Sequence, residues 1–473
     1  MQNKNPIFII LYLLVFILNL SFYTSSYSAI MPKLKSNDHF TIFLDVTIVD
    51  VESGKLKPNS WVLIKDNKII NIGSKNNLVI PKKSKIINTK GKYLIPGLWD
   101  MHVHILDSQK IAFPSFIANG VVGVRDMSAS FEQIEMWKEE ASKSIYTPRI
   151  FYSGPALDNK IKSHFNIKTE EEARKAVRLF QEKGVDFIKP YTWLEKNIYY
   201  ALVDECKIRK IPFAGHVPFE MSPMEASNLG QSSIEHFAEF FVAASKLADE
   251  VWNNIAKTNN IEELFYLDLK AANSIDYDKE NNIINAFAKN KTWQTPTLSV
   301  QRGYFATSTD ERSKYIPKNI KKFWEDTIAE RKSSERLQKM SSEVFDKFLI
   351  LTNKMNKAKV PFLAGTDANI STLEALPNVF YGFSIHDEME LFVKAGLNPI
   401  EALQTATINP AKFLGIDKDY GSIEIGKTAD LVLLTENPLI HIENTKKIDS
   451  VMINGILFNK NDIEKTLKQL QDQ

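Results

Sequence analysis

Short apolar runs alternate with helical stretches between residues 97 and 411, and this alternation limits the possible folds more than any other feature of the sequence. Parallel strands joined by helices produce such a pattern. Eight strand–helix units over this length match a barrel with insertions, so we predict an α/β protein built on a (β/α)₈ TIM barrel. Two long helical insertions, at 237–292 and 299–359, are expected to cap the barrel mouth. The predicted strands span residues 98–104, 121–126, 149–153, 185–189, 211–216, 233–236, 293–298 and 360–367.

Both flanks of this central block instead carry the two-residue alternation of β-strands. Near the C-terminus, Asn454-Gly455 between two apolar runs is a strong hairpin signal. We expect residues 38–96 and 412–460 to form one small composite β-sandwich domain, because the β-rich pattern of the first flank returns after the central block. A short C-terminal helix is expected over residues 461–473.

The first 28 residues have the composition of a secretory signal peptide. Lys4 precedes an almost wholly apolar run from Pro6 to Leu20, and small and polar residues follow it. We therefore expect cleavage near Ser28 and a secreted or periplasmic protein. The apolar run nearly reaches the length of a membrane span, so an uncleaved anchor is the alternative.

Composition narrows the possible partners and metal ligands. The net charge is only +2, whereas a nucleic-acid-binding protein usually carries a concentrated basic stripe. The single cysteine, Cys206, excludes an internal disulfide and any metal site made of cysteines alone. A metal ion would therefore need histidine, carboxylate or lysine ligands.

The pair His102 and His104 ends the first predicted barrel strand. Residues two apart on a strand point to the same face, so the two imidazoles converge on one point, as metal ligation requires. Further candidates end four other predicted strands, and barrel enzymes place their active sites at these strand ends. Those candidates are Lys189, His216, His236 and Asp367.

Several motifs around these residues make the sequence resemble the amidohydrolase superfamily, and within it the imidazolonepropionase-like and prolidase-like branch with two metal ions. The resemblance extends from about residue 40 to about residue 460 and implies a TIM barrel with a composite β domain. The matching segments are LIPGLWDMHVH at 94–104, FIKPY at 187–191, AGH at 214–216, IEH at 234–236, AGTD at 364–367, and two trailing blocks at 402–411 and 421–432.

The resemblance also implies roles for the candidate residues. The more buried metal ion would be held by His102, His104 and Asp367, and the second by His216 and His236. Lys189 would bridge the two ions as a carbamate formed with carbon dioxide, because an ammonium group cannot ligate a cation. Zinc suits this ligand set, although manganese or cobalt could replace it. Asp367 would move the proton from the metal-bridging hydroxide to the leaving nitrogen.

The predicted reaction is hydrolysis of an amide-type C–N bond in a small molecule, with an Xaa-Pro or other dipeptide as the first choice. The resemblance also makes Tyr191 and His164 candidate substrate-binding residues: Tyr191 follows Lys189 by two and should face the same way, and His164 lies in the long loop after the third strand. A cyclic-amide, lactam or ester hydrolase stays open, as does a barrel that binds metal or ligand without catalysis. A mononuclear deaminase would not need Lys189. A homo-oligomer is expected by analogy alone.

Overall fold

The computed structural model describes residues 30, 40–74, 78–219, 221–371 and 376–472. The predicted signal peptide at residues 1–28 lies outside this part of the chain. Within it, every helix is too short or too polar to cross a membrane.

Three strands begin the central barrel: β6 (Leu98–Val103), β7 (Val121–Asp126) and β8 (Arg149–Tyr152) pair in parallel. A second parallel pair is formed by β11 (Ser233–Glu235) and β12 (Trp293–Thr295). All five consist of fully or mostly buried residues, as expected for strands covered on both faces.

Shorter extended segments complete a ring of eight between these strands. The amide of Asp186 donates to Tyr152 O over 2.9 Å, which joins the fourth barrel segment, predicted over residues 185–189, to β8. Because single bridges make the remaining connections, the ring closes through fewer hydrogen bonds than long strands would give. The predicted (β/α)₈ barrel is confirmed. These bridges pair Ile188 with Phe213, Gly215 with Ile234, Gln294 with Phe362, and Val103 with Ala368.

One predicted strand ends too late. The seventh was expected over residues 293–298, but β12 ends at Thr295 and α11 (Leu298–Gly303) already begins at Leu298. Thr297 has a φ of 50°, a left-handed conformation that a strand cannot contain. The chain therefore turns sharply at the barrel mouth, where the sequence pattern suggested a continued strand.

Helices follow each barrel segment, and several begin at capping residues. Ser130 and Gln133 form a reciprocal capping box at the start of α3, which fixes where that helix begins. The helices after the successive segments include α2 (Gln109–Ala118), α3 (Phe131–Lys143), α4 (Glu170–Glu182), α5 (Lys196–Arg209), α6 (Pro223–Asn228), α10 (Tyr277–Asn290), α13 (Glu335–Lys357) and α14 (Ser384–Ala395).

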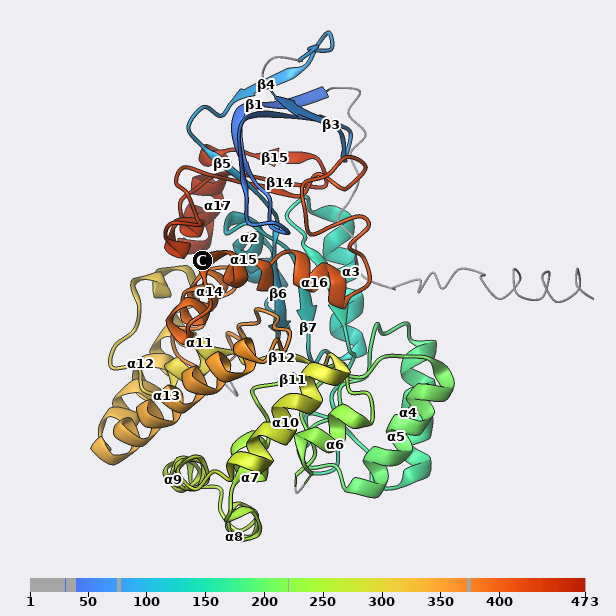
Figure 1. The fold of residues 1–473 in the computed structure, drawn as a ribbon, viewed down its shortest axis with the longest axis vertical. Coiled ribbons are helices and arrows are strands. Elements are labelled where there is room, and N and C mark those ends of the chain that lie inside the picture. The colour runs from blue at the N-terminus through green and yellow to red at the C-terminus, as the bar shows by residue number, and fades with distance from the viewer. Residues whose placement is uncertain (1–29, 31–39, 75–77, 220, 372–375, 473) are drawn as a thin grey trace, which may run out of the picture.

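Further helices lie in the long stretches after β11 and β12. Figure 1 shows α7, α8 and α9 at the end of the molecule opposite the strands of the flanking sheet. The bounds of these helices are α7 (Phe240–Ala244), α8 (Ala248–Ile255), α9 (Ile261–Asn273) and α12 (Lys318–Lys332). The chain ends with α15 (Pro399–Thr405), α16 (Ile408–Phe413) and α17 (Lys460–Gln471).

Strands from both flanks of the chain form one continuous sheet in the order β15-β14-β13-β5-β1-β2-β3, with β4 pairing to β1. Asn454 and Gly455, with φ of 52° and 77°, form the predicted two-residue hairpin between β14 and β15. The strands are β1 (Phe40–Val49), β2 (Leu56–Lys65), β3 (Lys68–Ser74), β4 (Lys85–Asn88), β5 (Tyr93–Pro96), β13 (Leu431–Leu434), β14 (Ile448–Ile453) and β15 (Ile456–Phe458).

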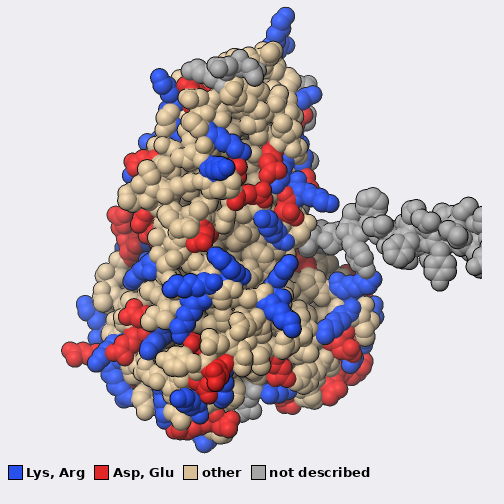
Figure 2. Space-filling view, viewed as in Figure 1, with Lys and Arg blue, Asp and Glu red and all other residues tan. Residues whose placement is uncertain are grey.

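This sheet has a hydrophobic core of its own, in which Val62 and Leu94 from the first flank contact the same cluster as Leu431 and Met452 from the second. Figure 2 shows basic and acidic residues intermingled over the visible face of the molecule.

Candidate metal centre

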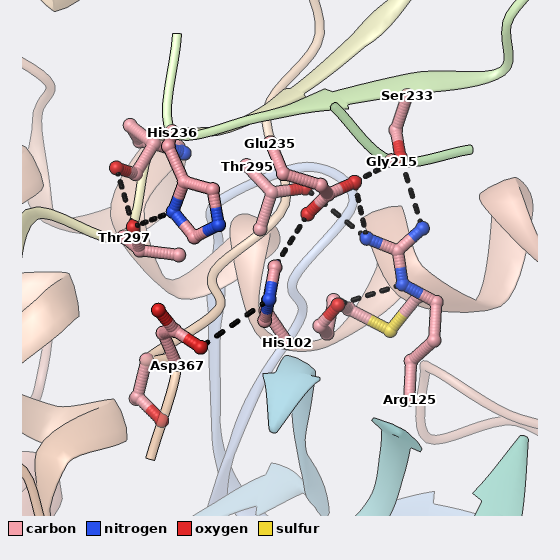
Figure 3. Close-up of polar contacts among 12 residues, drawn as sticks. His102, Arg125, Gly215, Ser233, Glu235, His236, Thr295, Thr297 and Asp367 are labelled. Carbon is pink, nitrogen blue, oxygen red and sulfur yellow. Dashed lines mark hydrogen bonds and ion pairs between the residues drawn. The ribbon is translucent and has the colours of Figure 1, made fainter. Parts of the chain in front are cut away.

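Imidazoles and one carboxylate meet at the C-terminal end of the barrel strands (Figure 3). One ligand atom each from His102, His236 and Asp367 lies within 4.8 Å of the other two. Asp367 Oδ1 is 3.4 Å from His102 Nε2 and 3.2 Å from His104 Nε2. The ring centroid of His216 is 4.9 Å from that of His236. The structure thus brings the four histidines and the aspartate named from the sequence into one cluster.

Three of the imidazoles, the buried His102 and the half-buried His216 and His236, are each held through the Nδ1 atom, which leaves Nε2 as the ligand atom. His102 Nε2 is buried and has no hydrogen-bond partner among the described residues. A buried polar atom without a partner is rare in folded proteins and calls for an explanation such as a bound ion. The donor set therefore fits a divalent cation. The three contacts are His102 Nδ1 to Glu235 Oε2 at 2.8 Å, His216 Nδ1 to Thr192 Oγ1 at 2.8 Å, and His236 Nδ1 to Thr297 Oγ1 at 2.7 Å.

Burial sets the charge of these groups. It lowers the pKa of His102 and of His216 well below the usual range, so both rings are neutral, which is the ligating form. Burial also lowers the pKa of Lys189 to about 8, against the attraction of the nearby Asp367 carboxylate. The Lys189 side chain is only 1% exposed. A fraction of this amine is therefore unprotonated near neutral pH, as reaction with carbon dioxide requires.

Asp367 stays ionised despite its position. Burial acts to raise the pKa of its carboxyl group, but the hydrogen bond from His104 and the positive potential of His236 lower that pKa overall. Its side chain is 23% exposed, whereas His102 beside it is fully buried. The carboxylate is thus the reachable acid–base group of the cluster.

A buried ion pair supports His102 from behind (Figure 3). Arg125 Nη2 donates to Glu235 Oε1 over 2.8 Å, while the other oxygen of Glu235 accepts from His102. Arg125 also donates to Ser233 Oγ over 2.9 Å and to Met101 O over 2.7 Å. Arg125 and Glu235 are both fully buried. The pair therefore fixes the imidazole of His102 in one orientation.

Two glycines allow the backbone to approach the site closely. A Cβ atom at Gly365 would lie 2.8 Å from the Cβ atom of His102, and one at Gly215 would lie 2.6 Å from Pro190 O. Side-chain atoms do not fit at such distances, so the AGTD and AGH segments need glycine for packing rather than for flexibility.

Three non-glycine residues at the site have positive φ: His236 at 60°, Thr297 at 50° and Asp367 at 56°. This conformation is uncommon for residues other than glycine, asparagine and aspartate, and it is unusual for β-branched threonine. Strained backbone of this kind concentrates at functional sites. Each residue lies where the chain leaves a barrel segment, so the strain accompanies the turn that aims the side chain into the cluster.

The two residues expected to contact substrate lie beside His216. The ring of Tyr191 stacks on His216 with centroids 4.0 Å apart, and His164 meets Tyr191 edge-on at 4.4 Å. His164 Nδ1 lies 3.7 Å from Asp158 Oδ2. Both residues are half-buried.

Three residues that orient the imidazoles were not predicted from the sequence: Glu235, Thr192 and Thr297. Of these, only Glu235 could have been recognised from the sequence, because it places a charge inside an apolar strand. Its partner Arg125 does the same in another strand. Buried charges need partners, so the two could have been paired with each other. Threonines after strands are too common to be singled out.

Comparison with known proteins gives a consistent result. The model of the Amidohydrolase family matches residues 93–457. The chain is 23% identical to a 5'-deoxyadenosine deaminase of Methanobrevibacter smithii, over 85% of this chain and 88% of the relative. It is 22% identical to an imidazolonepropionase of Flavobacterium psychrophilum, over 84% of this chain and 91% of the relative.

Among solved structures, the fold is similar to that of a Xaa-Pro dipeptidase with bound methionine in its active site. The TM-score is 0.63 at 21% identity, over 89% of this chain and all of the other. At this identity, the likeness concerns the fold.

Proposed function

We propose that this protein hydrolyses C–N bonds in dipeptides, including Xaa-Pro dipeptides. The chain belongs to the amidohydrolase family, because the family model covers most of its length. The observation that carries the proposal is the orphaned His102 Nε2 beside the partly exposed Asp367 carboxylate. An ionised carboxylate next to the neutral imidazoles of His102 and His216 suits metal-assisted hydrolysis. We also propose that the chain is secreted or periplasmic, from the composition of its first 28 residues.

We assign two zinc ions to the cluster. The first would be held by His102, His104 and Asp367, and the second by His216 and His236, with carboxylated Lys189 between them. When bound, the ions supply positive charge that lowers the pKa of water and polarises the scissile carbonyl.

The residues of the chain have separate tasks in this proposal. Asp367, kept ionised by its histidine neighbours, accepts a proton from the attacking water and returns it to the leaving nitrogen. Glu235, Thr192 and Thr297 hold the imidazoles in place throughout. Tyr191 beside His216 contacts the substrate.

Imidazolone-ring hydrolysis is the second candidate, because the imidazolonepropionase relative spans most of this chain. The buried Lys189 favours a two-metal hydrolase over a mononuclear deaminase, which would have no need of it.

A panel of dipeptides, including Xaa-Pro members, tests the proposal on zinc-loaded protein in bicarbonate buffer. Wild type should hydrolyse some members, Asp367→Asn should lose activity at least 100-fold, and the exposed control Asp204→Asn should match wild type. Metal content is measured in parallel. Two bound ions without turnover of any dipeptide would reject the peptidase and direct the search to cyclic amides; protein that binds no metal would reject the mechanism.

A further inference from the structure

A half-buried group of aromatic side chains lies next to His216, a proposed ligand of the second metal ion. The proposed mechanism gives most of these side chains no role. It consists of Tyr191, Trp193 and Phe219, and we call it the aromatic wall. Tyr191 stacks on the His216 ring. The Trp193 and Phe219 rings lie 5.2 Å apart at 40°. Each of these three large aromatic side chains is therefore only partly covered by the protein.

Hydrogen bonds tie the wall rigidly to His216. Thr192 uses its hydroxyl group to hold His216 Nδ1, and its carbonyl oxygen accepts from the amide of Phe219 over 2.6 Å. Because Trp193 directly follows Thr192, one residue links the metal ligand to both outer aromatic side chains. The wall is thus fixed relative to the proposed metal pair.

A second set of contacts comes from the loop between β9 (Leu157–Asp158) and β10 (Phe165–Asn166). Asp158 Oδ1 accepts from the amide of Trp193 over 3.0 Å, and its Oδ2 accepts from the amide of Ile161 over 3.1 Å. Lys160 Nζ lies 3.7 Å from the Trp193 ring centroid, which adds a cation–π contact. Asp158 is fully buried and fixes the backbone at Trp193.

We propose that the aromatic wall binds a large apolar or aromatic side chain of the substrate and sets the specificity of this enzyme. Preorganised aromatic surfaces lose little conformational entropy on binding and bury a large apolar area. A side chain as small as that of glycine or alanine would leave Trp193 and Phe219 exposed to water and gain nothing from them. The inference rests on the proposed hydrolysis of dipeptides, for which it names the substrate class.

The test compares two dipeptide series, Xaa-Pro and Ala-Xaa, with glycine, alanine, leucine or phenylalanine as the variable residue. In at least one of the two series, wild type should prefer phenylalanine and leucine over glycine at the variable position, by about 30-fold or more in kcat/KM. Trp193→Ala and Phe219→Ala should each reduce that preference about tenfold and leave the glycine member within threefold of wild type. The control Tyr315→Ala removes a half-buried ring stacked 5.2 Å from Phe383 and should keep the preference.

A preference for glycine in wild type, or an equal loss for every substrate in Trp193→Ala, would overturn the inference. If no dipeptide is cleaved, the proposed peptidase fails but the wall is still testable by calorimetry with L-phenylalanine and glycine. Zinc-loaded wild type should bind phenylalanine at least tenfold more tightly than glycine, and Trp193→Ala should bind both alike. Equal binding by wild type, or no binding of phenylalanine, would overturn the inference independently of activity.

Discussion

Replacing Arg125 by methionine should destabilise the fold strongly, because the substitution leaves a buried carboxylate without its cation. Arg125 and Glu235 are fully buried and 2.8 Å apart, and no solvent reaches either charge. Removing one partner of a buried ion pair typically costs about 3–5 kcal/mol. We therefore expect Arg125→Met to lower the free energy of unfolding by about 3–5 kcal/mol.

Glu235→Gln should cost a similar amount for a geometric reason. Glu235 accepts on both oxygens, from His102 Nδ1 on one and from Arg125 Nη2 and Ser233 Oγ on the other. A glutamine amide has one acceptor and one donor group, so in either orientation its NH₂ group meets another donor. The substitution also leaves Arg125 buried without an anion.

The double variant Arg125→Met/Glu235→Gln should unfold at a higher urea concentration than either single variant. Without the guanidinium group, the amide oxygen can accept from His102 while the NH₂ group donates to Ser233 Oγ. We expect the two effects to be non-additive by at least about 2 kcal/mol. Urea unfolding of metal-free wild type and the three variants measures this coupling directly.

Measuring zinc affinity separates the effect of Glu235 on the orientation of the His102 imidazole from its effect on the free energy of unfolding. Loss of a hydrogen bond to the distal nitrogen of a histidine ligand weakens metal binding about 10–100-fold, and we expect this of Glu235→Gln. Arg149 and Asp430 form another buried ion pair, remote from the cluster. Arg149→Met should therefore lower stability comparably but leave zinc affinity unchanged. Additive effects in urea, or equal zinc affinity in Glu235→Gln and wild type by chelator competition, would refute the reasoning.

Three further predictions concern single residues. Thr297→Ala removes the hydroxyl group at His236 Nδ1 and should weaken zinc binding about tenfold, with recovery in Thr297→Ser; equal affinities by chelator competition would contradict this. Gly365→Ala should lower the free energy of unfolding in urea by about 1–3 kcal/mol, because its Cβ would lie 2.8 Å from that of His102; an unchanged midpoint would exclude the clash. Burial raises the pKa of Glu388 from 4.5 to about 7, so the folded chain binds a proton that the unfolded chain releases. Wild type should therefore lose stability relative to Glu388→Gln as pH rises from 4.5 to about 7, and a pH-independent difference would count against this.

The barrel could be predicted from sequence because its strands are continuous apolar runs with helices between them. The expected bounds of β7 agree with the structure. The end of β12 could not be predicted, since the left-handed turn at Thr297 is imposed by tertiary contacts rather than by a glycine. Burial of a strand can thus be predicted from its apolar residues, whereas a strained backbone conformation such as that of Thr297 cannot be predicted from the residue type.

The positions of the cluster residues followed from one rule, that side chains at the ends of parallel strands meet at one end of the barrel. That rule located His216 and Asp367 without any alignment. It says nothing about rotation of a side chain around its own bonds, which depends on partners from other strands. Thr192 and Glu235 therefore emerged only from the structure.

Strained backbone and buried charge both occur at this end of the barrel, and both oppose stability. A glycine at position 297 would adopt the observed φ without a steric penalty, whereas threonine at such an angle costs of the order of 1 kcal/mol or more. Glycine, however, has no hydroxyl group for His236 Nδ1. Likewise, two apolar side chains would fill the space of Arg125 and Glu235 without desolvating charge, but neither could hold the ring of His102. The sequence departs from the most stable choice at the positions where a side chain must orient an imidazole, as a preorganised metal centre requires.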